Sequence, residues 1–222
     1  MKLNLRELIW CFLFRLKIIR LFVFYNIKRY KKKLKSLDGL NLKKESVIID
    51  IGANNGVVAH YLFDKYSCNI HIFEPNPYCY ELLKKIFKNN LKVKIYDKAV
   101  SNMSGHQKLY LSIRSADIKN MGLSEISSLE KKKINISLDK FVLVKSISID
   151  ELIKEFSYID FIKIDIEGHE YKIMSSLIKN FDKINKIFCE MHGSTHGEEF
   201  KKDFEHWDKK LIPFKNRKFK YW

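Results

Sequence analysis

The sequence predicts an α/β fold in which a mostly parallel, doubly wound sheet carries helices on both faces. Three short runs rich in Val and Ile lie at residues 47–51, 69–73 and 93–96, and the first is almost continuously apolar, as expected of a strand buried on both faces. Segments with helical spacing of apolar residues separate the runs, and a βαβαβ order favours a parallel sheet with right-handed crossovers. The length of 222 residues suits one ordinary domain, which we predict to span residues 41–222.

A basic amphipathic segment, residues 1–40, precedes this domain. Residues 1–35 contain 11 basic side chains and one acidic side chain, and three of the basic ones interrupt the apolar run at its centre, so the segment is not predicted to span a bilayer. Two interpretations stay open: a helix that binds the anionic surface of a membrane, or a helix that packs on the domain or on a second subunit. A secretory signal peptide fits less well, because the apolar stretch is short and broken by charge.

The rest of the excess charge lies at the other end of the chain. The net charge is +16, but residues 209–222 hold six basic residues and no acidic ones, and residues 36–208 are balanced. A neutral globular part argues against a protein that binds nucleic acid over its folded surface.

The turn after the first strand carries residues suited to a nucleoside cofactor. Gly52 and Gly56 let the backbone approach a ligand closely, and Glu74, which follows the second strand, is placed to bind ribose hydroxyls. The spacing is Gly-x-x-x-Gly, and the dinucleotide fingerprint is absent because Asn54 stands at its second glycine. The negative charge of Asp50 suits the cationic, phosphate-free S-adenosylmethionine better than a pyrophosphate.

The segment after the third strand has less specific signals. Asp97 has two interpretations, a carboxylate that accepts a hydrogen bond from the adenine amino group or a surface turn residue paired with Lys98. Residues 101–105 predict a hairpin turn into the next strand. Residues 114–140 are expected to be an irregular loop, which either covers the acceptor pocket or has no role. An extended segment at 141–149 then leads into a helix.

A second group of polar residues begins near the end of the apolar run at 161–166. Asp165, Glu167, His169 and Glu170 lie at the carboxyl end of this predicted strand, where open α/β sheets hold ligands. The next strand, at 186–190, brings Glu190 and His192 to the same edge.

Three interpretations of this group stay open. Methyl transfer to a hydroxyl requires removal of a proton, which predicts a catalytic role for Asp165, Glu167, His169 and His192. Alternatively, Asp165, Glu190 and His192 are candidate ligands of a divalent metal. The third interpretation is an ion-pair network with Lys163 that only stabilises the end of the strand.

These clusters resemble the FkbM-type methyltransferases, a branch of the S-adenosylmethionine-dependent Rossmann-like enzymes. The resemblance runs in unbroken order over about residues 46–192, and its matching stretches are residues 47–56, 73–77, 98–101 with Gly105, 148–152, 160–170, and Glu190 with His192. It implies a class I methyltransferase fold with S-adenosylmethionine as cofactor. The chain departs from the family pattern after residue 192, where little room remains for the usual final pair of antiparallel strands.

The cofactor contacts that we predict are Asp50, Gly52, Asn54, Gly56, Glu74, Asn76, Asp97 and Ala99. The resemblance places the acceptor near Asp165, Glu167 and His169. The shortened C-terminal end implies an acceptor side that is trimmed or completed by another subunit, as in a homo-oligomer.

The function that follows is S-adenosylmethionine-dependent O-methylation of a saccharide or glycan hydroxyl, in the biosynthesis of a cell-surface polysaccharide or glycolipid. The alternatives are an RNA methyltransferase and a non-catalytic Rossmann-like interaction module. The four cysteines, Cys11, Cys68, Cys79 and Cys189, lack the spacing of a zinc site or disulfide framework. They suit free thiols in the cytoplasm. If residues 1–35 bind a membrane surface, we expect the protein at the inner face of that membrane.

Overall fold

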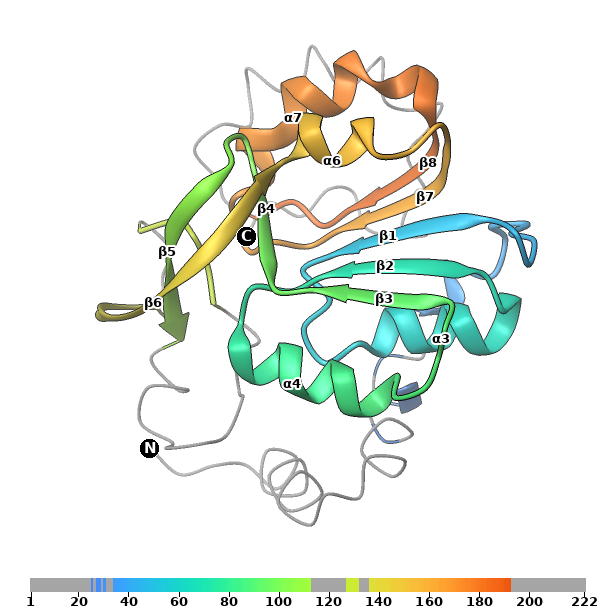
Figure 1. Ribbon diagram of the computed structural model, residues 1–222, viewed down its shortest axis with the longest axis horizontal. Helices are drawn as coiled ribbons and strands as arrows, with labels where there is room; N and C mark the ends of the chain where they lie inside the picture. Colours follow the sequence, from blue (N-terminus) through green and yellow to red (C-terminus); the bar gives the residue numbers. More distant parts are fainter. Residues whose placement is uncertain are drawn as a thin grey trace.

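The computed structural model describes residues 25, 27–28, 30, 34–112, 127–131 and 136–192. At its centre is a five-stranded sheet with the order β3-β2-β1-β7-β8, in which every neighbouring pair is parallel (Figure 1). The strands are β1 (Val47–Ile51), β2 (Asn69–Phe73), β3 (Val93–Tyr96), β7 (Ile159–Ile164) and β8 (Ile184–Cys189). The predicted parallel sheet is therefore confirmed, and its first three strands have the predicted bounds.

Helices cover both faces of this sheet. α3 (Val57–Tyr66) and α4 (Pro77–Ile86) lie on one face, and α6 (Ile149–Lys154) and α7 (Glu170–Lys179) lie on the other, where the 3₁₀ helix η1 (Phe181–Lys183) leads into β8 (Figure 1). α4 begins where expected for a capped helix, because the Asn76 side chain accepts a hydrogen bond from the Tyr78 N–H and Pro77 occupies the first turn. The sheet is doubly wound, as predicted.

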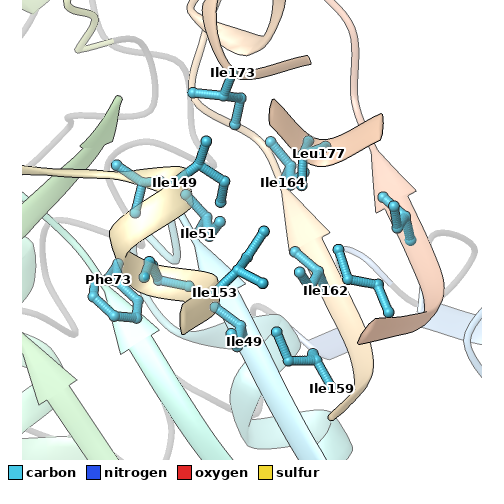
Figure 2. Packing of buried hydrophobic residues seen from close by; sticks show 14 of the residues in the cluster. Ile49, Ile51, Phe73, Ile149, Ile153, Ile159, Ile162, Ile164, Ile173 and Leu177 are labelled. Atoms are coloured by element: carbon cyan, nitrogen blue, oxygen red, sulfur yellow. The ribbon is translucent and has the colours of Figure 1, made fainter. Parts of the chain in front are cut away.

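The two faces of the sheet are filled by alternate residues of the same strands. On β1, Ile49 and Ile51 pack with residues of α6 and α7 (Figure 2). Ile48, which precedes them on the strand, packs with residues of α3 on the opposite face. All three side chains are fully buried. This two-sided burial explains why β1 is almost continuously apolar.

A second, three-stranded sheet has the order β4-β6-β5. Its strands are β4 (Lys98–Ser101), β5 (Gly105–Ser112) and β6 (Ile136–Ser148). β4 and β5 are joined by the predicted turn, but they do not pair with each other, so the expected hairpin is wrong: β6 lies between them, parallel to β4 and antiparallel to β5. Residues 136–140, expected to be loop, belong to β6, because they extend its pairing with β5 as far as Ser112.

The described part of the N-terminal segment packs on the α3 face of the sheet. Leu34, Leu37 and Leu40 are buried in the same cluster as Ile48, and Ile27 and Tyr30 pack against that cluster. Within the described residues, no helix is both long and apolar enough to span a bilayer. The remaining residues of the 1–35 segment, Cys11 among them, lie outside the described part, as does the predicted C-terminal end after residue 192.

Candidate functional site

The candidate site lies where the strand order changes direction. From β1 the chain proceeds to β2 and β3 on one side, and β7 and β8 lie on the other side. In open α/β sheets, such a point leaves a crevice outside the carboxyl ends of the strands. Two clefts lie there, and they share Gly52, Asn54, Asp165 and Glu167 in their walls.

Gly52 is required by the close approach of two strand ends. Its φ is +72°, and a Cβ at this position would stand 2.0 Å from the carbonyl oxygen of Asp165. The chain is tied together here because the Asp165 N–H donates to the Ile51 carbonyl oxygen at 3.1 Å. A side chain at residue 52 would therefore separate the β1 turn from the β7 turn.

Beneath this junction lies a buried ion pair. The Lys163 Nζ is 3.3 Å from Asp50 Oδ1 and 3.7 Å from Asp165 Oδ2, and it donates to the Gly52 carbonyl oxygen at 2.6 Å. Lys163 and Asp50 are almost completely buried, so each charge depends on the other for compensation. Of the group for which an ion-pair network with Lys163 was an open interpretation, Asp165 has a described contact with this lysine. Asp50, the closer carboxylate, lies below the clefts rather than in their walls.

Glu74 lies in the wall of the first cleft with both carboxylate oxygens held by backbone groups. Oε2 accepts from the Asn54 N–H at 2.7 Å, and Oε1 accepts from the Asn76 N–H at 2.8 Å. Burial raises the pKa of this carboxyl group to about 7, although the two N–H donors and the charge of Lys163 act in the opposite direction. Asn76 thus orients Glu74 and caps α4, and it is not among the residues that line the clefts.

The other predicted cofactor residues have different surroundings. Ala99 lines the first cleft. Gly56, with a φ of +73°, lies against α4, where a Cβ would stand 2.5 Å from Leu83 Cδ2; it serves the packing of α3 on α4. Asp97 is exposed and its carboxylate is 3.6 Å from the Lys145 Nζ, so it is a surface residue whose partner is Lys145 and not Lys98.

Three of the predicted catalytic residues converge at the shared wall. His192 Nε2 is 3.7 Å from Glu167 Oε2 and 4.0 Å from Asp165 Oδ1, and one ligand atom from each of the three residues lies within 4.8 Å of the others. About a fifth of each side chain is exposed. This set, rather than the predicted Asp165, Glu190 and His192, has the spacing for a shared proton or a divalent cation; Glu190 lines the second cleft.

Glu170 was grouped with these residues in the sequence but assigned no role. Its side chain is fully buried, it accepts hydrogen bonds from the Ile166 and Gly168 N–H groups at 3.0 Å each, and its Oε1 is 3.1 Å from His192 Nδ1. The sequence feature that could have indicated a structural role for Glu170 is its place at the start of a helix, where an acidic side chain is favoured.

The structure does not bring His169 to this cluster. Its Nε2 is 2.8 Å from Ser101 Oγ and its Nδ1 is 2.7 Å from Glu130 Oε1, so the ring links β4 to the 127–131 segment. That segment also contacts the loop between β7 and α7, because Ser128 Oγ donates to the Glu167 carbonyl oxygen at 2.7 Å. Residues 127–129 line the first cleft beside Glu74, a contribution that their position in a long polar stretch did not reveal.

The charges around the clefts fit a cationic cofactor. Glu74, Asp165, Glu167 and Glu190 line them, and the one described lysine in their walls, Lys163, is paired with Asp50. A pyrophosphate would face these carboxylates without compensation, whereas a sulfonium with an uncharged adenosine would not. Glu74, held at the end of β2, is positioned for hydrogen bonds to a ribose, so the described residues fit S-adenosylmethionine.

The chain is similar to several known proteins. The chain is 25% identical over 162 residues to the hexuronic acid methyltransferase AglP of Haloferax volcanii; the match covers 72% of this chain and 62% of that protein. Among solved structures, a putative RNA methyltransferase from Pyrococcus horikoshii is similar with a TM-score of 0.40 and 12% identity, over 81% of this chain and 66% of that one. The mycolic acid cyclopropane synthase CmaA1 matches 30% of this chain and 26% of its own, with a TM-score of 0.28 and 15% identity.

The family comparison covers most of the chain. Residues 50–221 match the family described as the methyltransferase FkbM domain. This stretch contains Glu74, the three converging residues and both clefts apart from the N-terminal wall residues. The chain therefore belongs to the FkbM methyltransferase family, whose cofactor is S-adenosylmethionine.

Proposed function

We propose that this protein transfers a methyl group from S-adenosylmethionine to a hydroxyl oxygen of a saccharide. The observation that carries the proposal is the convergence of Asp165, Glu167 and His192 beside the cleft that contains Glu74. A hydroxyl that is alkylated must lose a proton, and these groups can accept one or hold a cation that acidifies the hydroxyl.

Glu74 and the β1 turn would hold the cofactor. Glu74 accepts hydrogen bonds from the ribose hydroxyls, and Ala99 with residues 127–129 encloses the nucleoside in the first cleft. When bound, S-adenosylmethionine supplies an electrophilic methyl group on a sulfonium. The carboxylates of Asp165 and Glu167, in the wall that the two clefts share, stabilise the positive charge next to the acceptor position.

Glu167 is the proposed proton acceptor. It lines both clefts, and its Oε2 lies closer to His192 Nε2 than Asp165 Oδ1 does. After Glu167 takes the proton from the attacking hydroxyl, its carboxyl group is neutral and can pass the proton to His192 Nε2, which lies 3.7 Å away. With a divalent cation present, the same three side chains would be its ligands, and the cation would lower the pKa of the acceptor hydroxyl.

The second cleft is the proposed acceptor site. Its described wall combines the aromatic ring of Tyr30 with the amides of Asn54 and Asn55 and the carboxylate of Glu190. Amides and carboxylates accept hydrogen bonds from several hydroxyl groups, as a saccharide presents them. The similarity to a hexuronic acid methyltransferase also supports a sugar as the acceptor class.

Residues 1–35 are proposed to hold the protein at an anionic membrane surface, where a lipid-linked glycan would be the acceptor. The support is their charge, 11 basic residues against one acidic, and the exposure of Lys28 and Lys35 while Ile27 and Leu34 pack inward.

The test is Glu167→Gln in the full chain. We expect the variant to bind S-adenosylmethionine as the wild type does in calorimetry, and to lose at least about 100-fold in turnover, as expected when a general base is removed. Turnover is measured as transfer of a labelled methyl group to a panel of neutral and uronic-acid oligosaccharides, each with and without Mg²⁺. The matched control is Glu81→Gln, which changes an exposed carboxylate on α4 that pairs with a surface lysine and should behave as wild type.

The outcomes separate the alternatives. Equal loss of cofactor binding and turnover in Glu167→Gln would contradict the assignment of Glu167. Methylation of RNA but not of saccharides would overturn the acceptor class, and cofactor binding without turnover on either substrate class would favour an interaction module. A strict need for Mg²⁺ would assign the three side chains to a metal.

A further inference from the structure

We propose that Glu170 is a positioning residue that holds the His192 ring in one orientation and one tautomer, with Nε2 directed at Glu167 and Asp165. The inference deepens the proposed function, on which the role of His192 rests. It starts from a buried carboxylate in contact with an imidazole at the edge of the clefts.

Glu170 has no exposed surface, and the described contacts of its side chain account for both oxygens. Oε2 accepts from the Gly168 N–H at 3.0 Å, and Oε1 accepts from the Ile166 N–H at 3.0 Å while standing 3.1 Å from His192 Nδ1. An ionised carboxylate only accepts hydrogen bonds, so the hydrogen between these two side chains belongs to Nδ1 of His192. Because Glu170 lies in the first turn of α7, the helix dipole stabilises its negative charge.

A neutral imidazole that carries its hydrogen on Nδ1 has an acceptor nitrogen at Nε2. In the structure, Nε2 is the ring nitrogen that faces the other two members of the cluster, at 3.7 Å from Glu167 Oε2 and 4.0 Å from Asp165 Oδ1. Accepting a proton and binding a cation both require that form of the ring. The Glu170 contact therefore prepares His192 for either chemistry.

The same carboxylate also supports the loop that carries the cluster. Ile166 and Gly168 flank Glu167, whose φ is +59°, and their N–H groups are the ones that Glu170 binds. A purely structural role would end with this support of the loop. The experiment must therefore detect the effect of Glu170 on the His192 ring itself.

The first measurement is the tautomer of His192 in the full-length wild type, from ¹⁵N-labelled imidazole signals assigned with His192→Gln. At a pH where the ring is neutral, we expect the Nδ1–H form, and in Glu170→Gln we expect a mixture of tautomers or the Nε2–H form. The control is Glu130→Gln, which removes the carboxylate partner of a different histidine, His169, and should change the signals of that ring alone. A wild-type ring with its hydrogen on Nε2 would overturn the inference, and this result does not depend on the folding of Glu170→Gln.

The second measurement is a double-mutant cycle of turnover, with the oligosaccharide of the panel that the wild type methylates. Glu170→Gln is expected to lower kcat by about 10- to 100-fold, as is usual for partners of active-site histidines, with less than about a threefold change in the KM for S-adenosylmethionine. In a His192→Ala background, the same substitution should lower kcat by less than about threefold, because its target is missing. An equal loss in both backgrounds would show that Glu170 acts only on the loop and would overturn the inference. Absence of methylation together with the Nδ1–H tautomer would count against the proposed function alone.

Discussion

Glu74 is a buried carboxyl group in the wall of the first cleft, and the proposed function gives its charge a role in binding the cofactor. With a pKa of about 7 in the folded protein, it is mostly protonated at the acidic edge of the physiological range. Because this value lies above the ordinary 4.5, its contribution to stability is present below about pH 4.5 and is lost as the pH rises through about 7. The ionised form, which is the one proposed to accept hydrogen bonds from the ribose hydroxyls, therefore becomes the major form only above about pH 7 in the protein without cofactor.

This titration predicts how cofactor affinity changes with pH. If only the ionised form binds, the apparent Kd for S-adenosylmethionine should fall by about tenfold between about pH 6 and about pH 8, in proportion to the ionised fraction. Glu74→Gln should remove this dependence and weaken binding by about 10- to 100-fold, the value of hydrogen bonds to a charged group. Calorimetric titrations of both proteins across this pH range provide the check. If the Kd of the variant still changes with pH, a group other than Glu74 causes the dependence.

His169 offers a second test among single side chains, because its two ring nitrogens bind Ser101 and Glu130 and not the cluster. We expect His169→Ala to loosen the 127–131 wall of the first cleft and to raise the Kd for S-adenosylmethionine by about tenfold, through loss of its hydrogen bonds. At saturating cofactor, kcat should stay within about threefold of wild type, in contrast to His192→Ala. A loss of kcat with unchanged cofactor affinity would restore the catalytic role predicted from the sequence.

The contrast between these two histidines marks how far the sequence predicted the site. Asp165, Glu167 and His192 follow strands whose order is clear from their apolar runs, so their meeting at one edge of the sheet was predictable. The direction of His169 was not, because residue 169 is the N-cap of α7 and its side chain is directed by contacts with Ser101 and Glu130, which are far away in the sequence. For the same reason, sequence spacing could not show that Glu167, rather than the predicted Glu190, lies in the cluster with Asp165 and His192.

At the scale of the secondary-structure elements, the stability of the junction between β1 and β7 depends on the absence of a side chain at Gly52. Gly52→Ala places a Cβ 2.0 Å from the Asp165 carbonyl oxygen at a φ of +72°. Relief of that contact must move the Asp165–Glu167 loop, and the left-handed backbone alone costs about 1–2 kcal/mol for a residue other than glycine. We expect a decrease of at least about 2 kcal/mol in the free energy of unfolding by urea, with weakened cofactor binding.

Gly39→Ala is the matched control for this substitution. Nothing lies within 4 Å of a Cβ at residue 39, and its φ is not in the left-handed region. Its free energy of unfolding should therefore change by less than about 1 kcal/mol. Equal stability of the two variants would mean that the strand ends can separate at little cost.

The two sheets show why some elements were predicted and others were not. A strand buried on both faces, as β1 is, carries its own signal, and short runs of Val and Ile also gave the bounds of β2 and β3 to the residue. In β6, four of the first five residues are only partly buried or exposed, and its place between β4 and β5 follows from pairing over long sequence distances rather than from local pattern. A turn at 101–105 predicts that the chain reverses, but it does not predict which strand fills the gap.

Across the chain, the N-terminal segment connects the charge distribution to the fold. Its two sequence interpretations are not exclusive, because Leu34 and Leu37 are buried in the core while Lys28 and Lys35 are exposed. Deleting residues 1–35 would remove Leu34 from the core, and a Leu side chain lost from a core costs about 2–5 kcal/mol. Charge substitutions therefore test the membrane proposal more cleanly than truncation does.

We expect the full chain to float with phosphatidylglycerol-containing vesicles but not with phosphatidylcholine vesicles, and to be released by salt. The double variant Lys28→Gln/Lys35→Gln should bind the anionic vesicles more weakly by about 2 kcal/mol, about 1 kcal/mol for each lysine, or about 30-fold in affinity. The matched control is Lys172→Gln/Lys179→Gln, which removes the same charge from exposed positions on α7, on the opposite face of the sheet. An equal loss in both variants would show attraction by net charge alone, whereas a loss confined to the first would orient the α3 face, and with it the Tyr30 wall of the second cleft, toward the lipid that carries the acceptor.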